Sequence, residues 1–472
     1  MHAAASIRLS IFSFRGGKGR LSKKTISILF ITLFVFLSIC PVAGILVFGQ
    51  SKAVANEVQT RPPKLFRGDG SFNTSVTKDI TDYVADHFAF RNQLINAWAE
   101  LNSTVFRISA EEQVILGTDG WLYYSSTADD YMGRGLGDAE LRLIARNLSL
   151  MQEYAEKCGA EFFFTIAPNK NSLYPEHMPA FIPRAQDASN ASRIRPMLDE
   201  YGVRYIDLFA PFSDEKEILY YQTDSHWTDR GAALAADILL SEMKKDTSFF
   251  TNTFSPGDPH RGDLYDMLYP TGKKAEMAQC YAPGFSFALD GNADGGNALT
   301  LHTLNGEKNG KLLCWRDSFG VSLYPYLADS FSESFFYREA AYHLTRMESM
   351  HSDTVLIELV ERNLDWLLSY VPVFPAPQRQ ISLDLAVSSE QIISAATRPD
   401  KESGLICVSG EIPEDRIPDS VYVRAGDCLY EAYLTRKDGK CVFHAYLEEG
   451  IEANALYLAC QNELVYYPFE EK

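Results

Sequence analysis

The sequence lacks the excess of basic residues that is typical of nucleic-acid-binding proteins. Its 472 residues contain 44 Lys and Arg against 62 Asp and Glu, which gives a formal net charge of −18. The first 24 residues hold six basic side chains and no acidic one, so they contribute +6 and the rest of the chain carries a net charge of −24. Because a surface this acidic repels phosphate backbones, we expect no binding to nucleic acid.

Residue patterns that hold metals or cofactors are also scarce. The nine histidines are scattered with no two at ligand spacing, and the eight cysteines lack the spacing of a zinc site. No Gly-rich loop is suited to the pyrophosphate of CoA. We therefore expect neither a metal nor a cofactor. Four cysteines, Cys407, Cys428, Cys441 and Cys460, could form two disulfides in one of three pairings, and buried free thiols are the open alternative.

No charged residue occurs from Ile26 to Phe48, an uncharged stretch of 23 residues. At about 1.5 Å per residue, a helix of this length crosses a hydrocarbon core of about 30 Å. The basic residues before it predict a cytoplasmic N-terminus and an exported remainder. A cleaved signal peptide is the alternative, since "AVA" at 53–55 has a small-x-small pattern, but the stretch exceeds the roughly 7–15 apolar residues of such signals. We predict a cytoplasmic tail (1–24), a single-pass anchor in the cell membrane (25–48, with the span at 26–48) and a stalk (49–75).

Helical and strand patterns alternate from about residue 138 onward. "DAELRLIARNLSLMQEYAEKCG" and the run after Asp229 have helical spacing, and "AEFFFTIAP", "VRYIDL", "KLLCW" and "SDTVLIELV" are short apolar strands. Helices between buried apolar strands predict an α/β fold, with a parallel sheet flanked by helices on both faces. Before this region we expect one or two helices over 77–106 and two strands around the Asp-Gly turn of "VILGTDGWLYYSS". Residues 252–310 show only a long polar, Gly-rich stretch.

The pattern changes again after "PVFPAPQ" at 372–378. Residues 380–472 contain short, aromatic and partly alternating runs, such as "SVYVRA" and "CVFHAYL", separated by "KDGK" and "EEG". These runs predict a small C-terminal β module, of the sandwich type. We expect this module either to have a binding role of its own or only to pack on the preceding domain, and to supply no catalytic group.

Three polar clusters directly follow predicted strands, and ligands of open parallel sheets bind beyond the carboxyl ends of the strands. The clusters are "NKN" (169–171), "RDSFG" (316–320) and "ERN" (361–363). A fourth polar segment, "QTDSHWTDRG" (222–231), is able to reach the same edge. Thr228 or Asp229 is suited to cap the helix that follows it.

Ser318 is the candidate nucleophile of this edge. A serine at a strand-to-helix turn has its backbone N–H at a helix N-terminus, where negative charge is favoured, and this suits the oxyanion of acyl transfer. His226 is the candidate base, and Asp224 is the carboxylate that would fix its tautomer. In an extended segment positions i and i+2 share a face, so we expect Asp224 and His226 to lie together and Ser225 to point away.

The combination of these motifs resembles a known family. "DSHW" with a downstream "DSFG", together with "GTDGWLYY", "IAPNKNSLYPEHMP", "DSFGVSLYPYLADSF" and "VERNL", is similar to the DHHW proteins, relatives of the alginate O-acetyltransferases in the SGNH hydrolase-like group. The resemblance covers residues 75–372 and implies an SGNH-like catalytic domain over 76–372. It implies Asp224, His226 and Ser318 as the triad. The chain departs from the motif at Ser225, which stands where the family has His.

The resemblance also implies a reaction and its partners. It implies an O-acetyltransferase acting on an exported or cell-wall polysaccharide, with acetyl groups supplied by a membrane-bound O-acyltransferase. A polysaccharide acetyl-esterase with the same triad and a non-catalytic cell-surface glycan-binding protein remain alternatives. The usual oxyanion glycine and asparagine blocks are not identifiable. The candidates for the second oxyanion donor or for substrate contacts are Asn169, Lys170, Arg316, Trp227 and Arg362.

Overall fold

The computed structural model describes most of the chain. The described residues are 22–53, 59–291, 295–339, 342–384, 386–413, 417–437, 439–460 and 463–470. The predicted tail over 1–24 lies almost entirely outside them, as does most of the "AVA" motif at 53–55. The chain divides into two compact units, Met1–Ala97 and Trp98–Lys472, which are described separately below.

The first unit contains the long apolar helix that the sequence predicted. Helix α1 (Lys23–Phe48) begins after Ser22, whose side chain accepts a hydrogen bond from the backbone of Thr25. Within the described residues it is the one helix long and apolar enough to cross a membrane, a criterion that a signal sequence also meets. Helices α2 (Val76–His87) and α3 (Arg91–Leu101) confirm the expected helix pair.

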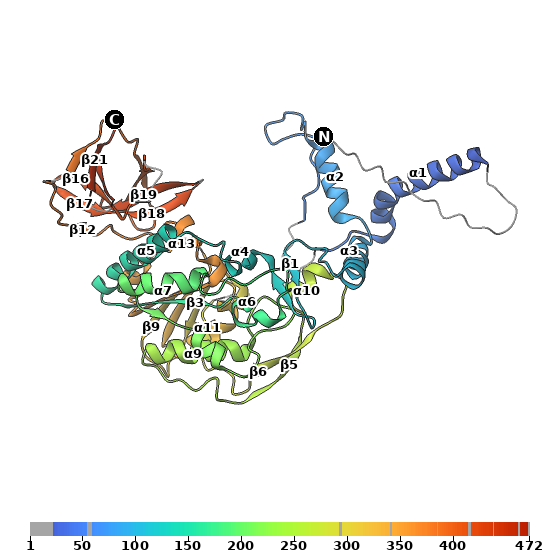
Figure 1. Cartoon of the computed structure of the whole chain (residues 1–472), viewed down its shortest axis with the longest axis horizontal. Helices are drawn as coiled ribbons and strands as arrows, with labels where there is room; N and C mark the ends of the chain where they lie inside the picture. The colour runs from blue at the N-terminus through green and yellow to red at the C-terminus, as the bar shows by residue number, and fades with distance from the viewer. Residues whose placement is uncertain are drawn as a thin grey trace, which may run out of the picture. The chain divides into compact units, whose positions relative to one another are not determined.

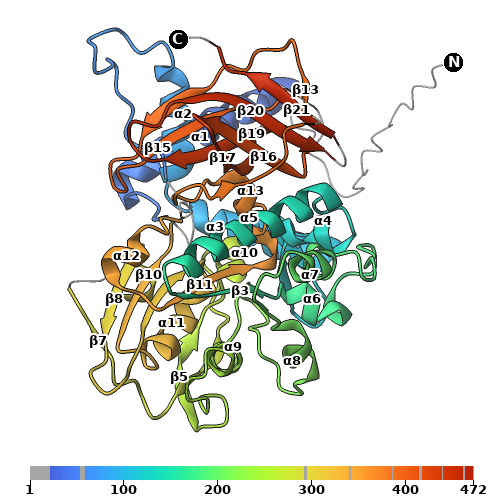
Figure 2. The same cartoon turned by 90° about the vertical axis from the view of Figure 1, so that its left-hand side faces the viewer.

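The second unit is built on a seven-stranded sheet with the strand order β4-β3-β11-β9-β10-β8-β7 (Figures 1 and 2). The first five strands in this order are parallel, and β8 and β7 add an antiparallel edge. The predicted α/β class with a mostly parallel sheet is confirmed. Its strands are β3 (Glu161–Ala167), β4 (Tyr205–Ile206), β7 (Ala288–Leu289), β8 (Thr300–Leu304), β9 (Lys311–Trp315), β10 (Glu333–Tyr337) and β11 (Thr354–Val360).

Alternating side chains of the central strands bury both faces of this sheet. Phe162 and Phe164 of β3 pack on one face beneath helices α5 (Asp138–Lys157) and α7 (Asn190–Glu200). Phe163 faces the opposite side, beneath α9 (Asp229–Glu242) and α11 (Gly320–Ala328). Thr228 caps α9 through its side chain, as expected. The two helical layers fix the carboxyl ends of β3, β9 and β11 at one edge.

The stretch over 252–310 contains elements that the sequence did not indicate. Strands β5 (Phe254–His260) and β6 (Glu276–Tyr281) form a hairpin that encloses helix α10 (Asp263–Leu268). The Asp-Gly hairpin is confirmed as β1 (Val114–Leu116) and β2 (Leu122–Tyr124). The remaining short helical segments are η1 (Asn102–Phe106), η2 (Ser125–Thr127), α4 (Ala128–Tyr131), α6 (Lys170–Leu173), η3 (Pro175–His177), α8 (Phe209–Asp214), η4 (Gly295–Asn297), α12 (Arg346–Met350), η5 (Glu361–Asn363) and α13 (Trp366–Ser369).

The C-terminal region forms a six-stranded and a four-stranded sheet, in agreement with the predicted β module. The strands are β12 (Gln378–Arg379), β13 (Ala386–Ser388), β14 (Ala396–Pro399), β15 (Ile406–Glu411), β16 (Ser420–Ala425), β17 (Cys428–Glu431), β18 (Tyr433–Lys437), β19 (Lys440–Leu447), β20 (Ala453–Cys460) and β21 (Glu463–Pro468). Cys407, Cys428 and Cys441 are free thiols, so the two-disulfide alternative is not seen.

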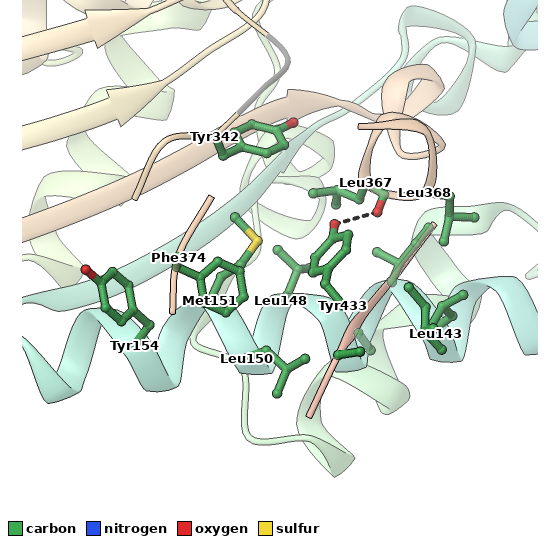
Figure 3. Packing of buried hydrophobic residues seen from close by; sticks show 14 of the residues in the cluster. Leu143, Leu148, Leu150, Met151, Tyr154, Tyr342, Leu367, Leu368, Phe374 and Tyr433 are labelled. Carbon is green, nitrogen blue, oxygen red and sulfur yellow. Dashed lines mark hydrogen bonds between the residues drawn. The ribbon is translucent and has the colours of Figure 1, made fainter. Parts of the chain in front are cut away.

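Strand β18 docks on helix α5 through a continuous buried core, shown in Figure 3. The Tyr433 hydroxyl donates to the carbonyl of Leu367 at 2.6 Å. Asn147 of α5 is fully buried, and its side-chain amide donates to the carbonyl of Leu434 at 2.7 Å and accepts from the N–H of Leu434 at 3.3 Å. The β strands thus complete the cover of α5, and removing them would expose its apolar face.

We expect Asn147→Ala to lower the free energy of unfolding of the whole protein by about 3 kcal/mol, because the N–H and the carbonyl of Leu434 would stay buried without partners. Urea-induced unfolding of the purified protein measures this change. Glu156→Ala, at an exposed position of the same helix, is the control and should stay within about 0.5 kcal/mol. Equal stability of the two variants would show that the bonds to Leu434 do not stabilise the docked strand.

Candidate active site

Ser318 lies on the turn between strand β9 and helix α11, where the sequence predicted it. The turn is tight, since a Cβ added at Gly320 would lie 2.5 Å from the Cβ of Arg316 and would have to displace it. The Ser318 Oγ lies 2.9 Å from Nε2 of His226. Among the described residues, the backbone N–H of Ser318 donates to no carbonyl or side chain. Ser318 therefore offers a paired hydroxyl and an unused N–H at the start of α11.

Asp224 and His226 lie together, as predicted. Nδ1 of His226 lies 2.7 Å from Oδ1 of Asp224, and the backbone N–H of His226 donates to the same oxygen at 2.9 Å. This contact fixes the proton on Nδ1 and leaves Nε2 to accept from Ser318. The carboxylate, the imidazole and the hydroxyl thus form one chain of hydrogen bonds. Such a chain is suited to remove the serine proton during nucleophilic attack.

The prediction that Ser225 points away from this pair is wrong. The backbone bends throughout residues 222–226, so the alternation of an extended segment does not apply. The Ser225 Oγ donates to Oδ2 of Asp263 at 2.6 Å and lies 3.2 Å from Nδ1 of His226. The N–H of Ser225 donates to the other oxygen of Asp263 at 2.8 Å. Ser225 therefore belongs to the hydrogen-bond network beside the imidazole.

Two residues that the sequence analysis missed complete the surroundings of Asp224. Nε2 of His260, at the end of β5, lies 2.8 Å from Oδ2 of Asp224, and the N–H of Asp263, at the start of α10, donates to the same oxygen at 3.0 Å. Burial opposes the charge of Asp224. The hydrogen bonds from His226 and His260 outweigh it and hold the pKa of this carboxyl well below its usual range. Asp224 is therefore a carboxylate with four donors.

Asp317, the residue before Ser318, fixes the turn that carries it. Its Oδ1 accepts the N–H of Phe319 at 2.9 Å. Its Oδ2 accepts the N–H of Val360 at 2.8 Å and the side-chain amide of Asn363 at 2.7 Å. These bonds tie the turn to the end of β11 and to the predicted "ERN" cluster. That cluster supports the site through Asn363.

Two buried acids lie behind these strand ends. Burial, with a smaller contribution from Asp317, raises the pKa of Glu358 well above its usual range. Burial and the nearby Asp130 raise the pKa of Glu361 to about 7, and its Oε2 accepts the N–H of Asn169 at 3.0 Å. An uncharged Glu358 fits its position within the sheet core, since a lone buried charge would be costly.

Lys170 binds and stabilises the loop that carries Asp224. Its ammonium is buried and donates to the carbonyls of Tyr221 at 3.1 Å, Gln222 at 3.0 Å and Asp224 at 2.5 Å. Burial lowers the pKa of Lys170 to about 7. Because three carbonyls take up all three N–H donors of an ammonium group, the geometry does not favour Lys170 as an oxyanion donor.

The side chains of Arg316 and Trp227 are also held by protein contacts, although the buried Nε of Arg316 has no hydrogen-bond partner among the described residues. Nη2 of Arg316 donates to the carbonyls of Gly296 at 2.7 Å and Ala298 at 3.2 Å. Trp227 is buried, its indole N–H donates to the carbonyl of Phe319 at 3.1 Å, and the two rings lie 5.0 Å apart. Trp227 therefore supports the turn that follows Ser318, and Arg316 holds the segment beside it.

Asn169 and Arg362 keep more of their polar groups available. Asn169 is buried at the end of β3, and among the described residues neither its Oδ1 nor its Nδ2, the atom that could donate to an oxyanion, has a hydrogen-bond partner. The guanidinium of Arg362 lies 5.4 Å from the ring centroids of Phe319 and Tyr124. Of the five predicted candidates, these two and the Nε of Arg316 remain for the oxyanion or for substrate contacts.

One group of potential metal ligands occurs within the described part of the chain. Asp224, His226 and Asp263 each offer an atom within 4.8 Å of the others. The hydrogen bonds of His226 to Asp224 and of Ser225 to Asp263 account for this proximity. The cluster is therefore explained as the hydrogen-bond network around the Asp224–His226 pair.

Comparison with known proteins finds similarity to the family that the sequence motifs resembled. Residues 114–283 match the family model of the SGNH hydrolase-like domain, acetyltransferase AlgX. This range includes Asp224 and His226 and ends before Ser318. The chain is 28% identical over 207 residues to the probable alginate O-acetylase AlgJ of Pseudomonas syringae pv. tomato, covering 42% of this chain and 51% of the relative. The chain thus spans about half the length of this curated relative.

Two solved structures are similar to this chain over 53% of its length. The structure of Bacillus cereus PatB1 with a sulfonyl adduct has 17% identity and a TM-score of 0.43 and is covered over 95% of its chain. A DHHW family protein from Eubacterium siraeum has 18% identity and a TM-score of 0.40 and is covered over 94% of its chain. The resemblance expected from the sequence is confirmed by the family match: over residues 114–283 the chain is similar to the SGNH hydrolase-like acetyltransferase family of AlgX.

Proposed function

We propose that this protein is an O-acetyltransferase that acetylates a polysaccharide outside the cytoplasm through an acetyl ester on Ser318. The observation that carries the proposal is the chain of hydrogen bonds from Asp224 through His226 to Ser318, with distances of 2.7 and 2.9 Å. It gives a hydroxyl an adjacent base and gives that base a carboxylate. The curated relative is named a probable alginate O-acetylase, which supports a polysaccharide acceptor.

In the first half-reaction, Ser318 Oγ attacks the carbonyl carbon of an acetyl ester while Nε2 of His226 takes the serine proton. Asp224 compensates the charge of the imidazolium, which then gives the proton to the leaving oxygen. In the second half-reaction, a sugar hydroxyl loses its proton to His226 and attacks the acetyl carbon, and Ser318 recovers its proton. The unused N–H of Ser318 is suited to the oxyanion, with Asn169 as the candidate second donor.

Helix α1 is the proposed anchor of this enzyme, with its N-terminus in the cytoplasm and the site outside. Acetyl-CoA is cytoplasmic, so a donor must pass the acetyl group across the membrane. We assign this role to a membrane-bound O-acyltransferase. An anchor of one helix would hold the catalytic domain close to such a partner and raise its effective concentration there.

A cavity of about 820 Å³ beside the catalytic loop is the proposed acceptor site. Its wall includes Thr223, which precedes Asp224, and the rings of Tyr265 and Tyr269 on helix α10. Phe181 lines the same cavity and is 79% exposed. The volume is in the range of ligand pockets, and aromatic rings beside polar groups are suited to sugar rings. Helix α10 therefore contributes to both places, because its Tyr265 lines the cavity and the N–H of its Asp263 donates to Asp224.

The test of this function is acetyl transfer from a small ester to oligosaccharides. We expect the purified protein to move acetyl from p-nitrophenyl acetate, but not from acetyl-CoA, onto an oligosaccharide detected by mass spectrometry. In cells that lack the partner acyltransferase, the polymer should stay unacetylated. Efficient transfer directly from acetyl-CoA would contradict the relay, and release of acetate alone with every acceptor would favour the acetyl-esterase.

A variant of the proposed acceptor cavity sharpens this test. Phe181→Ala should raise the KM for the oligosaccharide several-fold and leave the hydrolysis of p-nitrophenyl acetate unchanged, because the ring lines the cavity and makes no hydrogen bond or ring contact with Asp224, His226 or Ser318. Leu299→Ala is the control, since Leu299 is a similarly exposed apolar side chain outside the cavity. An unchanged KM in Phe181→Ala would place the acceptor elsewhere.

A further inference from the structure

Asp224 lies between two imidazoles, of which the proposed mechanism uses one. Oδ1 faces Nδ1 of His226 at 2.7 Å, and Oδ2 faces Nε2 of His260 at 2.8 Å. The His260 ring stacks on Tyr221, with centroids 4.1 Å apart and planes at 23°. The stacking and the position at the end of strand β5 hold this imidazole in place. The second imidazole is therefore a fixed part of the site.

The contact with His260 restrains the orientation of the Asp224 carboxylate. Without it, Oδ2 would keep only the backbone N–H of Asp263 at 3.0 Å. A carboxylate that is free to rotate would point Oδ1 less often at His226. Since His226 must be in the correct tautomer and orientation to accept from Ser318, loss of this restraint would slow proton transfer.

His260 is also surrounded by negative groups. The hydrogen bond to Asp224 raises the pKa of His260 despite its partial burial. Glu276 lies opposite His260 in the β5–β6 hairpin, and Asp263 approaches from α10. The stacked Tyr221 is an uncharged phenol, because burial raises its pKa. These surroundings favour the imidazolium form, whose N–H and positive charge both stabilise the ionised carboxylate of Asp224.

We propose that His260 is a positioning residue of the acyl-transfer site, which orients the Asp224 carboxylate and places a positive charge beside it. The inference rests on the proposed role of the triad. It assigns two separable effects. The N–H of His260 orients the carboxylate and supports kcat, and the positive charge of His260 keeps Asp224 ionised, and so able to orient His226, at lower pH.

The experiment compares His260→Ala with His260→Gln in the purified whole protein, because the glutamine amide keeps a donor at a similar reach but carries no charge. In His260→Ala we expect kcat for p-nitrophenyl acetate to fall about tenfold or more, with KM unchanged. His260→Gln should recover most of kcat. In both variants the acid limb of the pH profile of kcat/KM should move to higher pH by about one pH unit.

His302→Gln is the matched control, since His302 also contacts two carboxylates, Asp290 and Glu333, at the far edge of the sheet. It should leave kcat and the acid limb unchanged. The proposal would be overturned if both His260→Ala and His260→Gln kept the kcat and the acid limb of the wild-type protein. It would also be overturned if kcat fell in His260→Ala and was not recovered in His260→Gln. If His260→Ala does not fold, the acid limb of the pH profile of His260→Gln still tests the proposal, because an unchanged acid limb in this variant would contradict it.

An NMR titration of the Asp224 carboxyl group separates this inference from the proposed function. Its midpoint should rise in His260→Gln whether or not the protein transfers acetyl groups. An unchanged midpoint would overturn the effect of the His260 charge on Asp224. Full ester hydrolysis in Ser318→Ala would instead overturn the proposed function and leave the titration result standing.

Discussion

Replacing Ser318 by alanine is expected to lower kcat for p-nitrophenyl acetate by about 10⁴-fold or more. Nε2 of His226 would then face no hydroxyl in this structure. The nearby Ser225 cannot replace it, because its Oγ lies beside Nδ1 of His226 and donates to Asp263. Alanine fits the turn without disturbing the contact between Gly320 and Arg316. The loss should therefore occur in a protein of unchanged stability.

His226→Ala should cause a similar loss, and the double variant should be little worse than either single one, because the two residues act as a unit. Ser225→Ala is the matched control. It removes the bond to Asp263 and leaves the pair of Ser318 and His226 intact, so we expect less than a tenfold decrease in kcat. In the wild type, mass spectrometry should find one acetyl group on the peptide with Ser318. Activity near the wild-type level in Ser318→Ala would remove this serine from the mechanism.

Asp224→Asn is expected to lower kcat by about 10⁴-fold, as loss of the orienting carboxylate does in other serine triads. This structure adds a second effect. The two carboxylate oxygens accept from four N–H groups, and two of these are backbone N–H groups of His226 and Asp263. Whichever way the amide is turned, its NH₂ faces a backbone donor that cannot change its proton. The variant should therefore also lose about 1–3 kcal/mol of stability.

Kinetics and thermal unfolding of Asp224→Asn measure the two effects separately. Asp263→Asn is the comparison, because Asp263 contacts the network through Ser225 and lies 3.6 Å from Nδ1 of His226. We expect Asp263→Asn to keep most of the activity. A decrease of less than about threefold in Asp224→Asn would show that another group orients His226.

The long periodic segments of the fold were predictable from the sequence. Helix α5 has apolar residues at helical spacing, and strands β3, β9 and β11 are each apolar over most of their length. Strand β5 could not be recognised, because "FSPGDPH" contains two prolines and a glycine that disfavour strands. Its hairpin partner β6, "EMAQCY", does not alternate regularly between apolar and polar residues. Strand β10 lies within an aromatic, mixed segment, so periodicity alone did not separate it from a loop.

The same limits explain which parts of the candidate site were found. Asp224, His226 and Ser318 follow predicted strands or precede predicted helices, so topology placed them at one edge. His260 lies on the unrecognised strand β5, and its contact with Asp224 depends on a hairpin that the sequence did not indicate. The carbonyls around Lys170 come from a bent loop, and no side-chain pattern encodes them. The position of a residue after a strand identified the polar candidates. It did not show which of them would be free to donate to an oxyanion and which, like Lys170, would bind backbone carbonyls of a loop.

The docking of β18 on helix α5 has a consequence for the biogenesis of the protein. Asn147 and its partner Leu434 are separated by 287 positions in the chain. At typical synthesis rates of about 5–20 residues per second, the apolar face of α5 waits roughly 15–60 s for the strand that covers it. During this interval the helix is a surface for chaperones and for aggregation. Premature termination before residue 433 would therefore yield chains that proteases remove, even though every triad residue has already been made.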